Sequence, residues 1–123
     1  KKSHKVKDWV SSIELLTNTP YKWGGRDTIG LDCSSLIQLG LQTHRYKFPR
    51  NSSDQKKICN NNIDIKDISR GHLIFWDGHV GVMVDKKNIL HANAHYMKVV
   101  IEPLKEVIKR IGIDKKFEIK KLL

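Results

Sequence analysis

Two stretches near the N-terminus repeat their apolar residues at the spacing of an α-helix. The first stretch predicts a helix from about Val6 to Thr17. The second predicts a helix from Asp32 to about Thr43. The buried face of this second helix is expected to hold Cys33, Leu36, Ile37, Gly40 and Leu41. Residues 21–26, between the two helices, are aromatic and glycine-rich, and we interpret them as a loop.

After Gly71 the pattern becomes that of β-strands. Polar residues 48–69 come first and are expected to be irregular, with a short helix around residues 52–59. Compact or alternating apolar runs then predict strands at residues 72–76, 79–84, 89–92, 97–101 and 117–122. Pro103 is expected to take the first position of a helix that ends near Ile111. This order indicates an α+β fold, with N-terminal helices packed on a central antiparallel β-sheet.

The length and composition are typical of one folded domain. The chain has 123 residues, 39% of them hydrophobic, and we expect a single domain over residues 1–123. No apolar run approaches the ~20 residues that a membrane-spanning helix needs. The chain begins with Lys1 and has no signal-peptide core, so we expect it to be the C-terminal part of a longer chain.

The net charge of +10 has two interpretations. It is typical of a protein that meets an anionic partner, but it also fits a solvated coat of lysines. Lysines outnumber arginines among the 23 basic residues and lie in every segment. Arginines and aromatic residues do not cluster as they do in readers of nucleic acid, so we expect no nucleic-acid partner.

Cys33 has an unusual position for a cysteine, at the start of a helix and directly after an acid. The N-terminal end of a helix favours a thiolate, but the charge of Asp32 opposes one. The helix alone is therefore not expected to activate Cys33, and a nearby histidine is needed to do so. The alternative is that Cys33 is a small apolar residue in a helix contact. The sequence has no CxxC pair, and we expect neither a disulfide nor a metal site.

Two of the six histidines lie on neighbouring predicted strands, His79 on the first and His91 on the second. A two-residue loop at residues 86–87 would turn their side chains to opposite faces of the sheet. A loop with an odd number of residues, or a bulge, would instead pair Gly81 with His91 and bring the two histidines together. We predict the second geometry, with His79 as the base for Cys33 and His91 orienting the ring of His79. His95 is expected to line the same cleft.

The residues that carry this chemistry lie in three blocks: PYKWGGRDTIGLDCSSL, RGHLIFWDGHVGVMV and ILHANAHYMKVVIEPL. Together these blocks resemble the NlpC/P60 family of bacterial cysteine peptidases, which have a compact papain-like fold. The third block resembles the subgroup that cleaves γ-D-glutamyl–diamino-acid bonds in peptidoglycan peptides. The resemblance implies a catalytic domain in which Cys33 is the nucleophile, His79 the base and His91 the orienting residue. It implies no cofactor.

The resemblance also implies a set of substrate-binding residues. Tyr21 is expected to bind the substrate or the oxyanion, and Asp32 the ammonium group of the substrate. Ser34 flanks the nucleophile, and Arg26 is expected to meet a substrate carboxylate. The sequence departs from the family at Ser35, where glycine is common and a larger side chain is expected to crowd the helix start. It departs again at His72, where an acid is common and its loss is expected to loosen a turn.

The implied partners are peptidoglycan peptides (muropeptides), with no nucleic acid and no membrane span. An upstream SH3-like domain, often found in such enzymes, is a further expected part of the full chain. The compartment stays open between the cell envelope and the cytoplasm, where wall peptides are recycled. Two alternative functions also stay open: a non-catalytic wall-binding module, and a thiol amidase or acyltransferase on the same scaffold.

Overall fold

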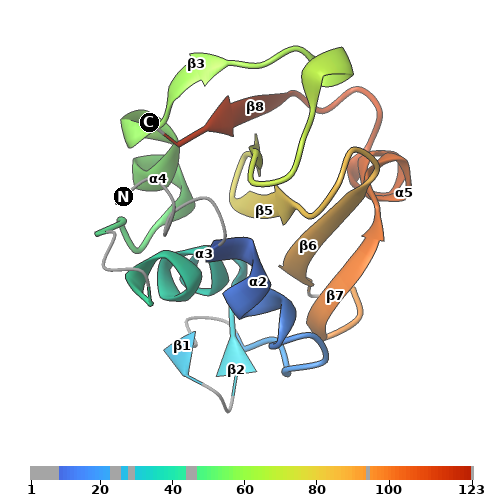
Figure 1. Ribbon diagram of the computed structural model, residues 1–123. Coiled ribbons are helices and arrows are strands. Elements are labelled where there is room, and N and C mark those ends of the chain that lie inside the picture. Colours follow the sequence, from blue (N-terminus) through green and yellow to red (C-terminus); the bar gives the residue numbers. More distant parts are fainter. Residues whose placement is uncertain (1–8, 23–25, 28–29, 44–46, 94, 123) are drawn as a thin grey trace.

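The computed structural model describes residues 9–22, 26–27, 30–43, 47–93 and 95–122. Its centre is a six-stranded sheet in which the strands lie in the order β3-β8-β4-β5-β6-β7 (Figure 1). Every pair of neighbouring strands is antiparallel. The strands are β3 (Asn60–Asn62), β4 (Leu73–Trp76), β5 (His79–Met83), β6 (Asn88–Asn93), β7 (Lys98–Pro103) and β8 (Phe117–Lys121).

The helices cover both faces of this sheet (Figure 1). They are α2 (Trp9–Glu14), α3 (Cys33–Gln42), α4 (Ser52–Ile58) and α5 (Leu104–Ile111). Helices α2 and α3 share one apolar core with Val80 and Val82 of β5. Helix α5 shares a second core with Met83 of β5, because successive residues of a strand point to opposite faces. This arrangement confirms the predicted α+β fold.

Helices α2 and α3 approach closely at Gly40. A Cβ atom at this position would lie 2.5 Å from Ile13 Cγ2 and 3.1 Å from Trp9 Cε3. Only a residue without a side chain lets the two helices pack at this distance. The contact anchors α3 from its outer side, while its inner side packs on β5 and β6. The start of α3, where Cys33 lies, is therefore held in a fixed place relative to the sheet.

Four residues lie between β5 and β6, and the first of them, Val84, still pairs with Asn88, so that three residues, Asp85 to Lys87, form the loop. The N–H of Val84 donates to the Asn88 carbonyl at 3.0 Å, and the carboxylate of Asp85 accepts the N–H groups of Lys87 and Asn88 at 2.7 Å each. The register of the two strands pairs Val82 with Leu90 and Met83 with Ile89. Continued by one step, that register sets Gly81 opposite His91. The predicted odd-numbered loop is confirmed.

The structure corrects several predicted boundaries. Helix α2 ends at Glu14 rather than Thr17, because the chain turns there and Asn18 has a φ of 77°. Pro103 ends β7 and caps α5 instead of lying at the first helical position. The polar segment before Gly71 contains strand β3, which pairs with β8, and a 3₁₀ helix at Ile65–Asp67.

The predicted loop at residues 21–26 is correct as far as it is described, except that Arg26 begins a small hairpin. This hairpin consists of β1 (Arg26–Asp27) and β2 (Gly30–Leu31). Within the part of the chain that the structure describes, no helix has the length and apolar character needed to cross a membrane.

Candidate active site

Cys33 is the first residue of α3, and the residue before it fixes that turn. The carboxylate of Asp32 accepts the backbone N–H of Ser35 at 2.9 Å, and the hydroxyl of Ser35 accepts the N–H of Asp32 at 3.0 Å. Two of the free N–H groups of the helix start are satisfied in this way. The expectation that Ser35 crowds the helix start is wrong, because its hydroxyl completes this capping box.

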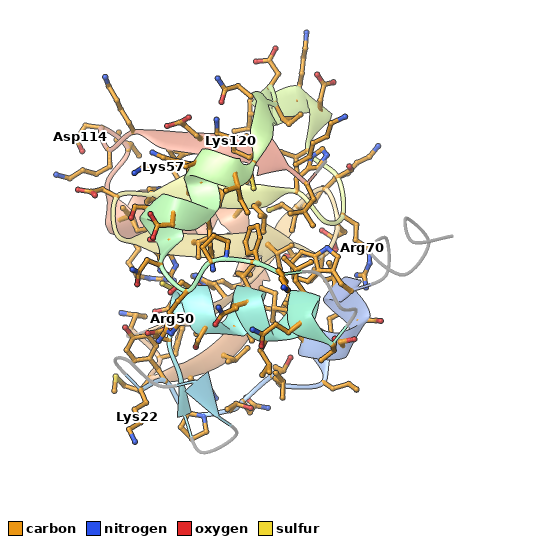
Figure 2. All side chains as sticks on the ribbon, turned by 90° about the vertical axis from the view of Figure 1, so that its left-hand side faces the viewer. Lys22, Arg50, Lys57, Arg70, Asp114 and Lys120 are labelled. Carbon is orange, nitrogen blue, oxygen red and sulfur yellow. The ribbon has the colours of Figure 1, made fainter. Side chains whose placement is uncertain are left out.

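Arg50 lies beside the start of α3 (Figure 2), where it binds Asp32. It donates to the two oxygens of Asp32 at 2.7 and 3.0 Å and to the hydroxyl of Ser34 at 2.9 Å. Burial raises the pKa of Asp32, but the hydrogen bonds from Arg50 and Ser35 outweigh it and hold the pKa below its usual value. Asp32 is therefore an anion beside Cys33. Sequence reasoning missed Arg50, because it lies in a segment without a regular pattern.

The sulfur of Cys33 lies against the start of β5. Its Sγ is 3.9 Å from the carbonyl oxygen of Gly78. Burial and the charge of Asp32 raise the pKa of the thiol, although the backbone N–H of Val80 lowers it. The resting group is therefore a thiol. Its sulfur lies beside Gly78, the residue before His79.

A tight turn between β4 and β5 places His79 at this position. Trp76 pairs with His79 across β4 and β5, so that only Asp77 and Gly78 connect the two strands. Gly78 has a φ of 77°, which a glycine adopts without steric cost. The ring of Trp76 lies 5.7 Å from that of His79, measured between centroids. The turn therefore sets both the carbonyl that meets Cys33 and the ring that follows it.

The rings of His79 and His91 are hydrogen-bonded, as predicted. Nε2 of His79 lies 2.8 Å from Nδ1 of His91. Burial and the nearby His91 together lower the pKa of His79 to about 3, although the charge of Glu102 acts in the opposite direction. Among the described residues, Nδ1 of His79 has no hydrogen-bond partner, and no hydrogen bond joins the His79 ring to Cys33 Sγ. His79 is therefore a neutral imidazole with one ring nitrogen free.

Glu102 and Arg110 continue this row of side chains behind His91. Nε2 of His91 lies 2.7 Å from Oε2 of Glu102, and Arg110 donates to the two Glu102 oxygens at 2.6 and 3.2 Å. Burial lowers the pKa of His91, although the hydrogen bond to Glu102 raises it. Burial raises the pKa of Glu102, but the bonds from Arg110 and His91 hold it below its usual value. Sequence reasoning missed both Glu102 and Arg110.

Two hollows adjoin at the peptide between Gly78 and His79. One has a volume of about 270 Å³ and is lined by Cys33, Asp32 and Ser34, with Arg50 and Gly78 among the others. The second has a volume of about 300 Å³, and its lining includes His79, His91, His95, Trp76 and Arg110. The predicted placement of His95 in the histidine cleft is confirmed. The thiol and the imidazoles therefore lie on two sides of the start of β5.

The remaining predicted residues differ in how far the structure describes them. Burial raises the pKa of Tyr21, and the charges of Cys33 and Asp32 raise it further, so its phenol lies within electrostatic range of both. The backbone of Arg26 forms β1, while its side chain lies outside the described part of the chain. His72 does not loosen its turn, since its Nδ1 accepts the N–H of Ser69 at 3.2 Å.

Cys59 differs from Cys33 in its surroundings. It is buried in the core that α2 and α3 share, and burial raises its pKa to about 11. Within the described part of the chain, no hydrogen bond links Cys59 to a histidine. A thiol with this pKa is almost fully protonated at neutral pH and is a poor nucleophile. Cys33, by contrast, has its sulfur beside Gly78, the residue before His79.

Several known proteins are similar to this chain in sequence or in fold. A γ-D-glutamyl-L-lysine dipeptidyl-peptidase of Bacillus subtilis is 28% identical over 111 residues, which cover 84% of this chain and 37% of that protein. The peptidoglycan hydrolase RipB of Mycobacterium tuberculosis has the same fold, with a TM-score of 0.82 and 21% identity over 99% of this chain and 66% of that one. RipD of the same organism is described as a non-catalytic NlpC/p60 domain protein adapted to peptidoglycan binding. It has a TM-score of 0.78 and 20% identity, and the match covers 97% of this chain and 98% of that one.

The chain spans about a third of the length of the curated relatives that it matches, 32% for a dipeptidyl-peptidase 6 of Lysinibacillus sphaericus. The profile of the NlpC/P60 family matches residues 18–111, which include Cys33, both paired histidines and Glu102. This match covers most of the chain and every element that builds the two hollows. The chain therefore belongs to the NlpC/P60 family.

Proposed function

We propose that this domain is a cysteine peptidase that hydrolyses γ-D-glutamyl–diamino-acid bonds of peptidoglycan peptides through a thioester on Cys33. The observation that supports it most is the 2.8 Å contact between His79 and His91, with the sulfur of Cys33 at 3.9 Å from the carbonyl oxygen of Gly78, the residue before His79. The names of relatives support the substrate class, since one is a γ-D-glutamyl-L-lysine dipeptidyl-peptidase.

The first step is proton transfer followed by attack. The pKa of Cys33 is raised and that of His79 is lowered, so the resting pair is a neutral thiol and a neutral imidazole. His79 accordingly acts as a general base, taking the thiol proton as Sγ attacks the γ-glutamyl carbonyl carbon. This step requires the Cys33 side chain to turn from the Gly78 carbonyl, which its sulfur contacts at 3.9 Å, toward the imidazole.

The second step releases the amine and then the acid. The backbone N–H of Cys33 and the phenol of Tyr21 stabilise the oxyanion of the tetrahedral intermediate. His79 returns its proton to the leaving nitrogen, and the carbon–nitrogen bond breaks to leave a thioester. Water, deprotonated by His79, then attacks the thioester, and the thiol regains its proton as the γ-glutamyl acid leaves.

Asp32 binds the ammonium group of the substrate in this proposal. Because Arg50 already bonds both oxygens of Asp32, an ammonium group has to share the carboxylate with the guanidinium. Ser34 lies beside this carboxylate, at 3.4 Å from one of its oxygens. Arg26 and His95 are proposed to contact the peptide on the two sides of the cleaved bond.

The test compares the two cysteines. Cys33→Ala is expected to abolish cleavage of L-alanyl-γ-D-glutamyl-diaminopimelate, because it removes the sulfur that lies beside Gly78 at the start of β5. Cys59→Ala is the matched control, since it removes the same atom from the buried core, and it is expected to retain turnover. Product is measured by liquid chromatography with mass spectrometry. Turnover by Cys33→Ala close to that of the unchanged protein would refute the proposal.

A non-catalytic wall-binding module is the second candidate. Two observations favour it: the fold of RipD, and the lack of a hydrogen bond between Cys33 Sγ and the His79 ring in the described part of the chain. A binding module would bind muropeptides equally well after iodoacetamide has alkylated Cys33, and it would release no product. Calorimetric titration of the alkylated protein, beside the product assay, separates the two candidates.

A further inference from the structure

Glu102 ends a row of hydrogen-bonded side chains that begins at His79. The row passes from His79 on β5 to His91 on β6, then to Glu102 on β7 and Arg110 on α5. All four lie on the face of the sheet that α5 covers. Ile89 pairs with Glu102 and His91 with Val100, so Glu102 lies diagonally beside His91 on that face. Its carboxylate can therefore reach only the ring nitrogen of His91 that points away from His79.

The carboxylate of Glu102 determines which ring nitrogens of His91 and His79 carry protons. Arg110 donates to both oxygens of Glu102, and an ionised carboxylate only accepts hydrogen bonds. The bond between Glu102 and His91 therefore needs a proton on Nε2 of His91. A neutral imidazole carries one proton, so Nδ1 of His91 has to accept, and Nε2 of His79 has to donate to it.

The orientation of Asn93 agrees with this assignment. Its Oδ1 accepts the backbone N–H of His95 at 2.6 Å, which fixes the amide so that Nδ2 faces Glu102. Nδ2 donates at 3.1 Å to the Glu102 oxygen that His91 also meets, and it lies 3.2 Å from Nε2 of His91. Because Nδ2 is a donor and the charged carboxylate is the stronger acceptor, its bond goes to Glu102, and Nε2 of His91 keeps its own proton. Three donors, from His91, Asn93 and Arg110, thus converge on Oε2 of Glu102, and this oxygen has no proton of its own.

We propose that Glu102 is a positioning residue that fixes the tautomers of His91 and His79 and thereby leaves Nδ1 of His79 as the free basic nitrogen. The tautomers depend only on the hydrogen bonds of this row. Their importance for catalysis rests on the proposed peptidase function. Without the carboxylate, His79 can carry its proton on Nδ1, and such a ring cannot accept a proton from the Cys33 thiol.

The first test is nitrogen NMR of protein labelled with ¹⁵N-histidine at neutral pH, where burial keeps both rings neutral. The expected spectrum has both His79 and His91 protonated at Nε2. A proton on Nδ1 of either ring would overturn the proposal. This measurement uses the unchanged protein, so it decides the matter even where a substitution prevents folding.

The second test is Glu102→Gln. Arg110 offers only donors, so the glutamine oxygen is expected to turn toward Arg110 and its amide nitrogen toward His91. His91 Nε2 then has to accept, and the protons of both rings move to Nδ1. The same NMR measurement is expected to show this inversion, and an unchanged pattern would overturn the proposal.

The third readout is catalysis. Glu102→Gln is expected to lower kcat at least about 100-fold, the size of a lost general base, with little change in KM. Glu106→Gln is the matched control, because it makes the same change on an exposed position of α5, and it is expected to keep full kcat. Unchanged kcat in Glu102→Gln would overturn the proposal and leave the peptidase assignment intact. If NMR shows the expected tautomers but the domain does not cleave the peptide, the proposal is upheld and the peptidase assignment is refuted.

Discussion

His79 is kept neutral by its burial, and this has a consequence for stability. The pKa of a histidine is about 6.5 in an unfolded chain, whereas burial lowers that of folded His79 to about 3. Between these two values the unfolded state binds more protons than the folded state. The free energy of unfolding therefore falls as the pH falls below about 6.5.

We predict that His79→Gln flattens this loss of stability. The unchanged protein should lose up to about 1.4 kcal/mol of unfolding free energy per pH unit through His79 below pH 6. Glutamine does not titrate, so its variant should lose less over the same range. Urea denaturation at pH 6.5, 5.5 and 4.5 measures the slopes, and parallel slopes for the two proteins would contradict the lowered pKa.

Strand pairing brings the two histidines together, and Gly81 makes their approach possible. A Cβ atom on Gly81 would lie 2.6 Å from Ile89 Cδ1 and 3.0 Å from His91 Cβ. The first contact is with the end of a side chain, but the second is with an atom fixed to the backbone of β6. A glycine at this position therefore sets the distance between β5 and β6 beside the site.

We predict that Gly81→Ala lowers the free energy of unfolding by about 1–3 kcal/mol, through overpacking. Ile89→Val removes Cδ1, the nearest atom, and alone should cost about 0.5–1.5 kcal/mol. The double variant should be more stable than the sum of the two losses implies, because the valine removes the nearest contact, that with Cδ1, while Cγ1 at 2.9 Å remains. Strict additivity in denaturation experiments would show that the clash with Ile89 is not the cause.

The periodicity of the sequence explains which parts of the site could be predicted. His79 and His91 could be paired because a strand alternates its faces and an odd-numbered turn preserves the face. Glu102 was missed because the sequence analysis ended the strand at Ile101, whereas β7 continues to Pro103 and carries Glu102 onto the histidine face. Arg50 was missed because it follows an aperiodic segment, and its pairing with Asp32 depends on how the chain folds back.

At the scale of the whole molecule, the two cores position the site from opposite sides of the sheet. The core of α2 and α3 carries Cys33, and the core of α5 lies beside the row from His79 to Arg110. Within the described part of the chain, the two sets of groups come together at the start of β5, where Gly78 and His79 are neighbours. A catalytic centre therefore requires the thiol to turn past Gly78 toward His79, and the lining of both hollows to hold one peptide.

The structure of the Cys33→Ala variant with bound L-alanyl-γ-D-glutamyl-diaminopimelate tests this central claim most directly. The variant keeps both hollows but does not cleave the peptide. We predict that the γ-glutamyl carbonyl carbon lies about 3–3.5 Å from the position that the thiol can reach, with the leaving nitrogen within about 3.2 Å of Nδ1 of His79. A peptide bound with its γ-glutamyl bond far from His79 would contradict the account.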